Sequence, residues 1–193
     1  MVKGLGEETQ LDWVADSDFR IFPTVRDELF GYVLHPVDLA INKATPAADR
    51  RVPRDIFDLV TIHERILPLG AVVCAAIGRF SGPTPEQMLA DIVRHGRFTP
   101  DEFQALATEM PVDAADLFGR IRAMLEDAGA FIARMPSDAV GFVFLEDGKV
   151  VQPDPTHLER YVRHAAQRRG HWPSSQEISS AMLERYTSTW RKS

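Results

Sequence analysis

Four prolines divide the middle of the chain into short helical segments. Pro36, Pro53, Pro85 and Pro100 each stand at the start of a run in which apolar side chains recur with helical spacing. Proline is tolerated in the first turn of a helix, where its missing N–H has no partner to lose. The pattern therefore predicts helices that begin at these four positions. The first is expected to end or kink at Thr45-Pro46, because a residue before proline is pushed out of the helical region.

Capping signals and apolar periodicity extend this prediction. Thr84-Pro85-Glu86-Gln87 and Thr99-Pro100-Asp101-Glu102 both match the capping box, in which a threonine and a Gln or Glu three residues later satisfy each other's backbone N–H groups. They predict helices over about 85–95 and 100–109. The second helix runs from Pro53 to about 66, and the uniformly apolar stretch 71–77 predicts a buried helix. Apolar spacing predicts a longer helix over about 112–134 and two more over about 155–169 and 174–190.

The two ends of this helical region have strand character. The first 35 residues contain short runs of aromatic and branched side chains and predict a two- or three-stranded antiparallel piece, which later helices must cover. Asp147-Gly148, within 141–151, is a strong hairpin signal. The sequence therefore predicts an α+β fold that is mainly α, with a small N-terminal antiparallel sheet followed by a helical bundle and a short hairpin near 141–152.

Composition excludes several classes of protein. The chain has one cysteine and no Cys/His cluster at zinc-ligand spacing, which excludes a disulfide scaffold and the usual structural zinc sites. It has neither a secretory leader pattern nor an apolar run of about 18 residues, so we expect a cytoplasmic protein that does not contact a membrane. The net charge is −6, yet residues 154–193 carry seven bases and four acids. Attraction to a polyanion is thus expected at the C-terminal end, unless these charges form only a solvated helix face.

Polar side chains are dense between residues 35 and 65. Asp38 and Lys43 belong to the first predicted helix, and Arg54, Asp55 and Asp58 to the second. Asp55 and Asp58 share a helix face, and Lys43 and Arg54 are placed to reach a phosphate from two helices. Acids paired with such bases suit either a metal-phosphate site or a structural salt-bridge network.

The same residues resemble a known family. His35-Pro-Val-Asp38-Leu-Ala-Ile-Asn42-Lys43, then Arg50, then Arg54-Asp55-Ile-Phe-Asp58-Leu resembles the signature that follows the catalytic sheet in nucleotidyltransferase-fold proteins of the AbiEii/AbiGii abortive-infection toxin type. The resemblance spans residues 11–80 well and the helical remainder more loosely. It implies transfer of a nucleoside monophosphate from a nucleoside triphosphate to an acceptor, often RNA, with Mg²⁺ or Mn²⁺. It also implies a cognate antitoxin as a partner, and missing strands favour a homo-oligomer.

The resemblance assigns roles to individual residues. Lys43, Asp55 and Asp58 are the implied catalytic residues, with one of the two aspartates as acid/base or orienting group. The implied nucleotide-binding residues are Lys43, Arg54, Arg50 and Asp38. Asp12, on a Leu-Asp-Trp strand, is the implied metal ligand.

The chain departs from the family at its front. A Gly-Ser or Gly-Gly turn followed by an Asp-x-Asp strand, which carries the family's metal ligands, is not found. Three explanations stay open: a truncated enzyme, a fragment completed by another polypeptide, or a relic without catalysis. The expected division is a partial nucleotidyltransferase core over 1–68, a helical domain with a terminal hairpin over 69–153, and a basic helical pair over 154–193. The alternative function is a non-catalytic helical interaction or RNA-associated module.

Three other motifs carry weaker signals. His63-Glu64 lacks the second histidine of a zinc-protease helix, since position 67 is leucine. Cys74 lies in an apolar run and is expected to be buried rather than nucleophilic. A face formed by His157, Tyr161, His164 and Arg168 on the predicted helix would suit RNA contacts or ordinary solvent exposure.

Overall fold

The computed structural model describes residues 2–3, 8–9, 19–79, 82–108 and 111–167. The fold is α+β and mainly helical, with small antiparallel sheets, which confirms the predicted fold class. The helices are α1 (Pro36–Asp49), α2 (Pro53–Arg65), α3 (Leu69–Ile77), α4 (Pro85–His95), α5 (Pro100–Gln104) and α6 (Ala114–Ile132), with 3-10 turns at Ser137–Ala139 and Leu158–Arg160. The strands are β1 (Val2–Lys3), β2 (Glu8–Thr9), β3 (Val25–Asp27), β4 (Gly31–Val33), β5 (Phe142–Glu146), β6 (Lys149–Val151) and β7 (Val162–Ala165).

The helix starts follow local sequence signals. Proline occupies the first turn of α1, α2, α4 and α5, and both predicted capping boxes are present. Asp113 caps α6 by accepting from the backbone N–H groups of Ala115 and Asp116. These signals act within four residues, which is why the sequence alone locates them.

The predicted end of the first helix is wrong. α1 continues through Pro46 to Asp49. Proline in a helix interior removes one backbone hydrogen bond and is costly. Here Ala44, Ala47 and Ala48 are buried in the core, and α1 packs against α2, α3 and α4. We attribute the continuation to this burial, which a local rule does not include.

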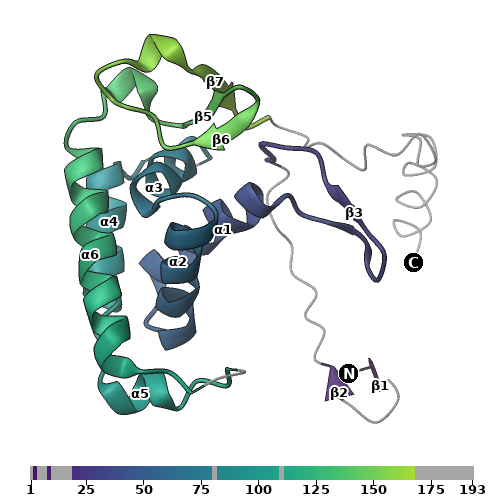
Figure 1. Ribbon diagram of the computed structural model, residues 1–193, viewed down its shortest axis with the longest axis vertical. Helices are drawn as coiled ribbons and strands as arrows, with labels where there is room; N and C mark the ends of the chain where they lie inside the picture. The colour runs from purple at the N-terminus through teal and green to yellow at the C-terminus, as the bar shows by residue number, and fades with distance from the viewer. Residues whose placement is uncertain (1, 4–7, 10–18, 80–81, 109–110, 168–193) are drawn as a thin grey trace.

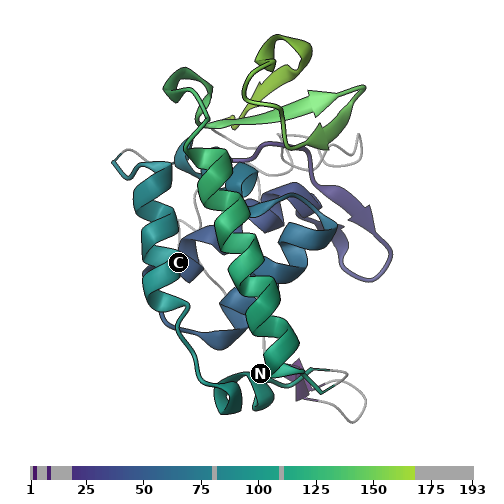
Figure 2. The same cartoon turned by 60° about the vertical axis from the view of Figure 1, so that its left-hand side comes forward.

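The helices enclose one hydrophobic core. It runs from Ile21 to Val143 and includes residues on both sides of the boundary expected near residue 68. α3 is buried almost all round, as predicted, while α6 packs against α3 and α4 (Figures 1 and 2). At the end of α3 the chain approaches β5 so closely that a Cβ on Gly78 would lie 2.5 Å from the carbonyl oxygen of Gly141.

A three-stranded sheet of order β6-β5-β7 covers one end of the helices. β5 and β6 form the predicted hairpin, with Asp147 and Gly148 both at positive φ as a tight turn requires. The prediction of a helix over 155–169 is wrong in the described part, because residues 162–165 form β7 and pair with the other edge of β5. That pairing joins segments about 20 residues apart and overrides local helical spacing. The helix predicted over 174–190 lies outside the described residues.

The β3–β4 hairpin projects from the helical body (Figures 1 and 2). It is the antiparallel piece predicted near the N-terminus, but none of the described helices covers its tip. Leu29 and Phe30 at the turn are 81% and 73% exposed.

None of the helices in the described ranges is both long and apolar enough to span a membrane. α2 and α3 pass such a test only when taken together, and they turn by 108° where they meet.

Candidate functional site

Lys43 and Asp58 meet at the centre of the candidate site. Lys43 lies on α1 and Asp58 on α2, and Lys43 Nζ is 2.6 Å from Asp58 Oδ2. The two side chains are 40% and 25% exposed. An exposed ion pair contributes at most about 1 kcal/mol to stability. The fold therefore gains little from this contact, whereas a ligand can reach both charges.

Arg54 lies one helical turn before Asp58 on α2 and adds positive charge to that side of the helix. It is exposed and forms no ion pair with any described residue. With Phe57 and Asp58 it lines a recess of about 60 Å³, whose opposite side is formed by residues 106–108. Asp58 thus belongs to both features, since it binds Lys43 and lines the recess with Arg54.

Asp38, an implied nucleotide-binding residue, serves the fold instead. Its side chain is buried, with 1% of the residue exposed. Its two carboxylate oxygens accept from the backbone N–H groups of Ile21 and Phe22 at 2.8 and 2.9 Å. A buried carboxylate with two such donors fixes the N-terminal segment on α1 and is shielded from a ligand.

Arg50 and Asp55 join the end of α1 to the start of α2. Arg50 Nε and Nη2 donate to Asp55 at 2.8 and 3.3 Å. The Asp55 side chain is 4% exposed, and the pKa of Arg50 is raised by its hydrogen bond and charge contact with Asp55. Of the two implied acid/base candidates, Asp58 is therefore the accessible one and Asp55 is a structural brace.

His35, the first residue of the motif, also has a local role. Its Nδ1 accepts from Val37 N at 3.2 Å and so caps α1. Its ring centroid lies 4.5 Å from that of Phe22, whose other neighbour is the His164 ring at 4.9 Å. Partial burial lowers the pKa of His35, against the opposing influence of Asp38. His164 Nε2 lies 2.6 Å from Ile21 O and ties β7 to the N-terminal segment.

The C-terminal helix face that would suit RNA contacts or solvent exposure is not formed by its described residues. His157 and Tyr161 flank the 3-10 turn Leu158–Arg160, His164 lies on β7, and Arg168 lies outside the described residues. Because side chains alternate along a strand, the spacing of four and three no longer places these residues on one face.

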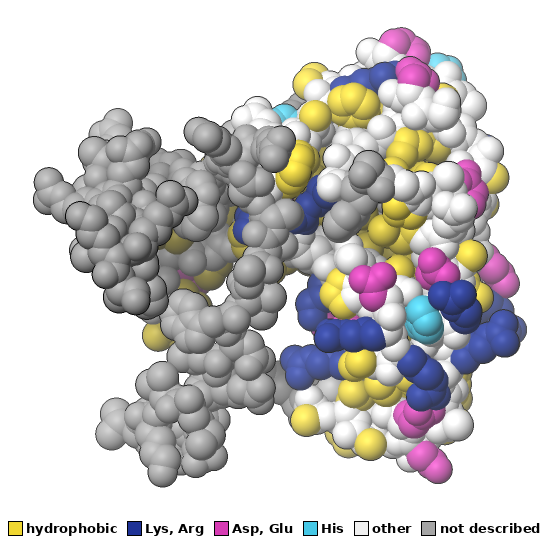
Figure 3. Space-filling view, turned by 180° about the vertical axis from the view of Figure 1, so that it is seen from behind, with side chains coloured by type: hydrophobic (Ala, Val, Ile, Leu, Met, Phe, Trp, Pro, Cys, Tyr) yellow, Lys and Arg dark blue, Asp and Glu magenta, His cyan; other side chains and the backbone are white. Residues whose placement is uncertain are grey.

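Exposed arginines gather instead where the C-terminal ends of α1 and α4 meet. We call this surface the arginine face; it consists of Arg50, Arg51, Arg94 and Arg97. Arg51 donates to Glu102 at 2.7 Å and to Arg97 O, and its guanidinium lies 4.4 Å from the Phe98 ring centroid. Figure 3 shows Lys and Arg side chains gathered on the lower half of the side opposite to Figure 1. Helix C-termini attract such cations through their partial negative charge.

A larger recess lies between α2 and the start of α6. Its volume is about 410 Å³. Its lining residues are Phe57, Thr61, Arg65, Pro111, Val112, Asp113, Asp116, Leu117 and Arg120. Sequence reasoning missed this recess, because it depends on how α6 packs on α2. The spacing of Arg54, Asp58, Thr61 and Arg65 by four, three and four residues was the available signal.

Among the described residues, protein side chains alone do not form a site for Mg²⁺ or Mn²⁺. They hold no group of three or more His, Cys, Asp or Glu side chains that is placed to bind a metal ion. Asp12, the implied ligand, lies outside the described residues. Asp55 and Asp58 are held by Arg50 and Lys43.

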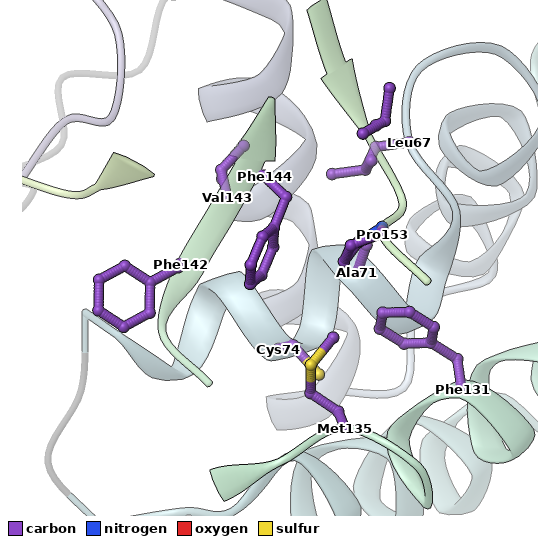
Figure 4. A pocket seen from close by; sticks show the side chains of 10 residues that line it. Leu67, Ala71, Cys74, Phe131, Met135, Phe142, Val143, Phe144 and Pro153 are labelled. Atoms are coloured by element: carbon purple, nitrogen blue, oxygen red, sulfur yellow. The ribbon is translucent and has the colours of Figure 1, made fainter. Parts of the chain in front are cut away.

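Cys74 is a core residue, as predicted. It is 1% exposed, and burial, with a smaller contribution from the charge of Glu86, raises the pKa of its thiol to about 12. Figure 4 shows it beside Met135 among apolar side chains. The cavity there measures about 10 Å³, room for no more than about one water molecule. This position excludes a nucleophilic role for Cys74.

Comparison with protein-family models, curated proteins and solved structures found no match.

Proposed function

We propose that this chain is a nucleotidyltransferase-like protein of the AbiEii/AbiGii type and that it supplies the triphosphate-binding side of the site. The reaction would transfer a nucleoside monophosphate from a nucleoside triphosphate to an acceptor, with RNA as the candidate acceptor. The observation that carries the proposal is the Lys43–Asp58 contact. It joins two motif segments 15 residues apart at 2.6 Å, in a position that a ligand can reach.

Three side chains have roles in this proposal. Lys43 donates to a phosphate oxygen, and Arg54 adds a second cation beside it. Asp58 repels the triphosphate but restrains Lys43 until the ligand arrives, and it is the candidate acid/base or orienting group. Phosphoryl transfer depends chiefly on such positioning and on charge neutralisation. Arg50 and Asp55 hold the two helices in register around them.

No metal-dependent step is assigned to the described residues. The family's reaction uses a divalent cation, but Asp58 is the only implied site acid in the described ranges that is both partly exposed and close to Lys43. The cation's ligands would have to come from residues outside those ranges or from another polypeptide. The proposal for this chain therefore concerns nucleotide binding first and transfer second.

A non-catalytic interaction module is the second candidate. The favouring observation is that Asp38, Asp55 and Asp58 all have partners within the fold. The arginine face would then be the contact surface, because the side chains of Arg50, Arg51 and Arg94 are 49–68% exposed even though each forms an ion pair. A cytoplasmic site of action, a cognate antitoxin and a homo-oligomer remain proposals under either function.

Binding of a labelled nucleoside triphosphate with Mg²⁺ or Mn²⁺ tests the proposal. We expect saturable binding by the full chain and its loss in Lys43→Ala. Lys149→Ala is the matched control, because Lys149 is an exposed lysine on β6 with no ion pair among the described residues. Equal binding by Lys43→Ala would exclude the phosphate role of Lys43. Absence of binding by the unaltered chain would favour the interaction module.

Label transfer to bulk RNA separates binding from catalysis. Binding without transfer would support a triphosphate-binding part that lacks its metal ligands. Binding with transfer would show that residues outside the described ranges complete the site.

A further inference from the structure

We propose that the recess between α2 and the start of α6 binds the nucleoside half of the triphosphate. This inference rests on the proposed function, in which Lys43 and Arg54 hold the phosphates. It adds a second part of the site, formed mainly by Phe57, Thr61, Arg65 and Asp116.

The two recesses lie along one face of α2. Arg54, Asp58, Thr61 and Arg65 follow one another at intervals of four, three and four residues, which places them on one side of a helix. Arg54 and Asp58 line the smaller recess, and Thr61 and Arg65 line the larger one. Phe57 lines both. Asp58 and Arg65 are seven residues apart, or about 10 Å along the helix axis.

The larger recess has the size and character of a small-molecule site. Its volume of about 410 Å³ falls within the usual range for such sites. Phe57 and Val112 supply apolar surface, and Arg65 and Asp116 supply polar groups. Arg65 is exposed and forms no hydrogen bond or ion pair with any described residue. Asp116 is 61% exposed and contacts Arg120 at 3.3 Å.

Charge indicates which half of a nucleotide each recess suits. The larger recess contains two arginines and two aspartates, and Arg120 is further neutralised by Glu64 at 2.7 and 2.6 Å. It therefore suits an uncharged group with hydrogen-bond donors and acceptors, not a polyanion. A nucleobase with its ribose has this chemistry, since its flat face packs on an aromatic ring and its edge accepts from Arg65 or donates to Asp116. The triphosphate belongs at the other end, beside Lys43 and Arg54.

Comparison of a nucleoside triphosphate with inorganic tripolyphosphate tests the inference. Both carry the phosphate chain, but only the first carries a base and a ribose. We expect the unaltered chain to bind the nucleoside triphosphate at least about tenfold more tightly than tripolyphosphate, as one good stacking contact would give. Arg65→Gln and Phe57→Leu should each reduce this ratio toward one. Arg65→Gln should also leave tripolyphosphate binding unchanged, because Arg65 lines only the larger recess. Phe57→Leu keeps an apolar side chain against the core, and Arg65→Gln alters an exposed residue.

Arg122→Gln is the matched control. Arg122 is an exposed arginine on α6 that does not line the recess, so its variant should keep the full ratio. If tripolyphosphate binds as tightly as the nucleoside triphosphate, or if the Arg65 and Phe57 variants keep the ratio, the nucleoside inference is overturned and the proposed function stands. If neither ligand binds the unaltered chain, both are overturned.

Discussion

Individual acids of this chain have different tasks even though they belong to one motif. Asp38 and Asp55 are buried and held by the fold, whereas Asp58 is partly exposed beside Lys43. The sequence predicts that these acids gather near basic residues. It does not indicate which is buried, because burial depends on where residues 19–22 and the end of α1 lie.

Removal of the Asp38 carboxylate should destabilise the protein strongly. Asp38→Ala would leave two backbone N–H groups without acceptors near the core, at a cost of about 2–4 kcal/mol in the free energy of unfolding. Asp49→Ala is the control, because Asp49 is an exposed acid on the same helix. Urea unfolding of the two variants measures the difference. Equal effects would contradict the role of Asp38 in fixing the N-terminal segment on α1.

Cys74 should resist alkylation in the folded protein. Its thiol has a pKa of about 12, mainly because burial disfavours the thiolate, so little nucleophile is present near pH 8. We expect iodoacetamide to modify Cys74 quickly only after denaturation. Because the pKa of Cys74 is raised in the folded state, its ionisation does not affect the free energy of unfolding below pH 9.0. As pH rises toward 12, ionisation of the unfolded chain lowers that free energy. Rapid labelling under native conditions would show that the thiol is accessible.

At the scale of elements, local sequence signals were sufficient to predict those helix starts and turns that depend only on residues nearby in the sequence. α4 and α5 begin at their capping boxes, and β5 and β6 turn at Asp147-Gly148. The same reasoning failed for β7 and for the end of α1. Both depend on partners distant in sequence, namely β5 for the strand and the surrounding core helices for α1.

Arg51 should keep the pKa of Glu102, in the short helix α5, well below its ordinary value. The hydrogen bond from Arg51, with help from the Thr99 backbone, lowers the pKa of Glu102 to about 2. The Glu102 carboxylate therefore contributes to the free energy of unfolding above about pH 4.5. This contribution is lost as pH falls toward 2 and the carboxylate is protonated. Arg51→Ala should raise the pKa of Glu102 toward its ordinary value, which carboxyl NMR titration measures. Arg94→Ala, the control on α4, should leave it unchanged.

At the scale of the whole molecule, stability comes from the helical core and not from the hairpin. Phe131 is 1% exposed, whereas Phe30 at the hairpin tip is 73% exposed. The core pattern was readable from apolar spacing. The recess between α2 and α6 was not, because it appears only when those helices are packed together.

Substitution of Phe131 and Phe30 should show that the core contributes much more to the free energy of unfolding than the hairpin tip does. Phe131→Ala is expected to lower the free energy of unfolding by about 3–5 kcal/mol. Phe30→Ser should change it by no more than about 0.5 kcal/mol, the usual range for exposed positions. Calorimetric melting of both variants measures this contrast. A large loss in Phe30→Ser would mean that the hairpin tip is covered in solution, for instance by a second copy of the chain.

The most direct measurement for the central proposal is nucleoside triphosphate binding by Asp58→Asn. Asp58 neutralises Lys43 and opposes an incoming triphosphate, whereas asparagine keeps the shape without the charge. If Lys43 is a phosphate-binding residue, Asp58→Asn should bind the triphosphate more tightly than the unaltered chain, and Lys43→Ala should not bind it. If Lys43–Asp58 is only a structural ion pair, neither the unaltered chain nor Asp58→Asn will bind, and that result would contradict the proposed function.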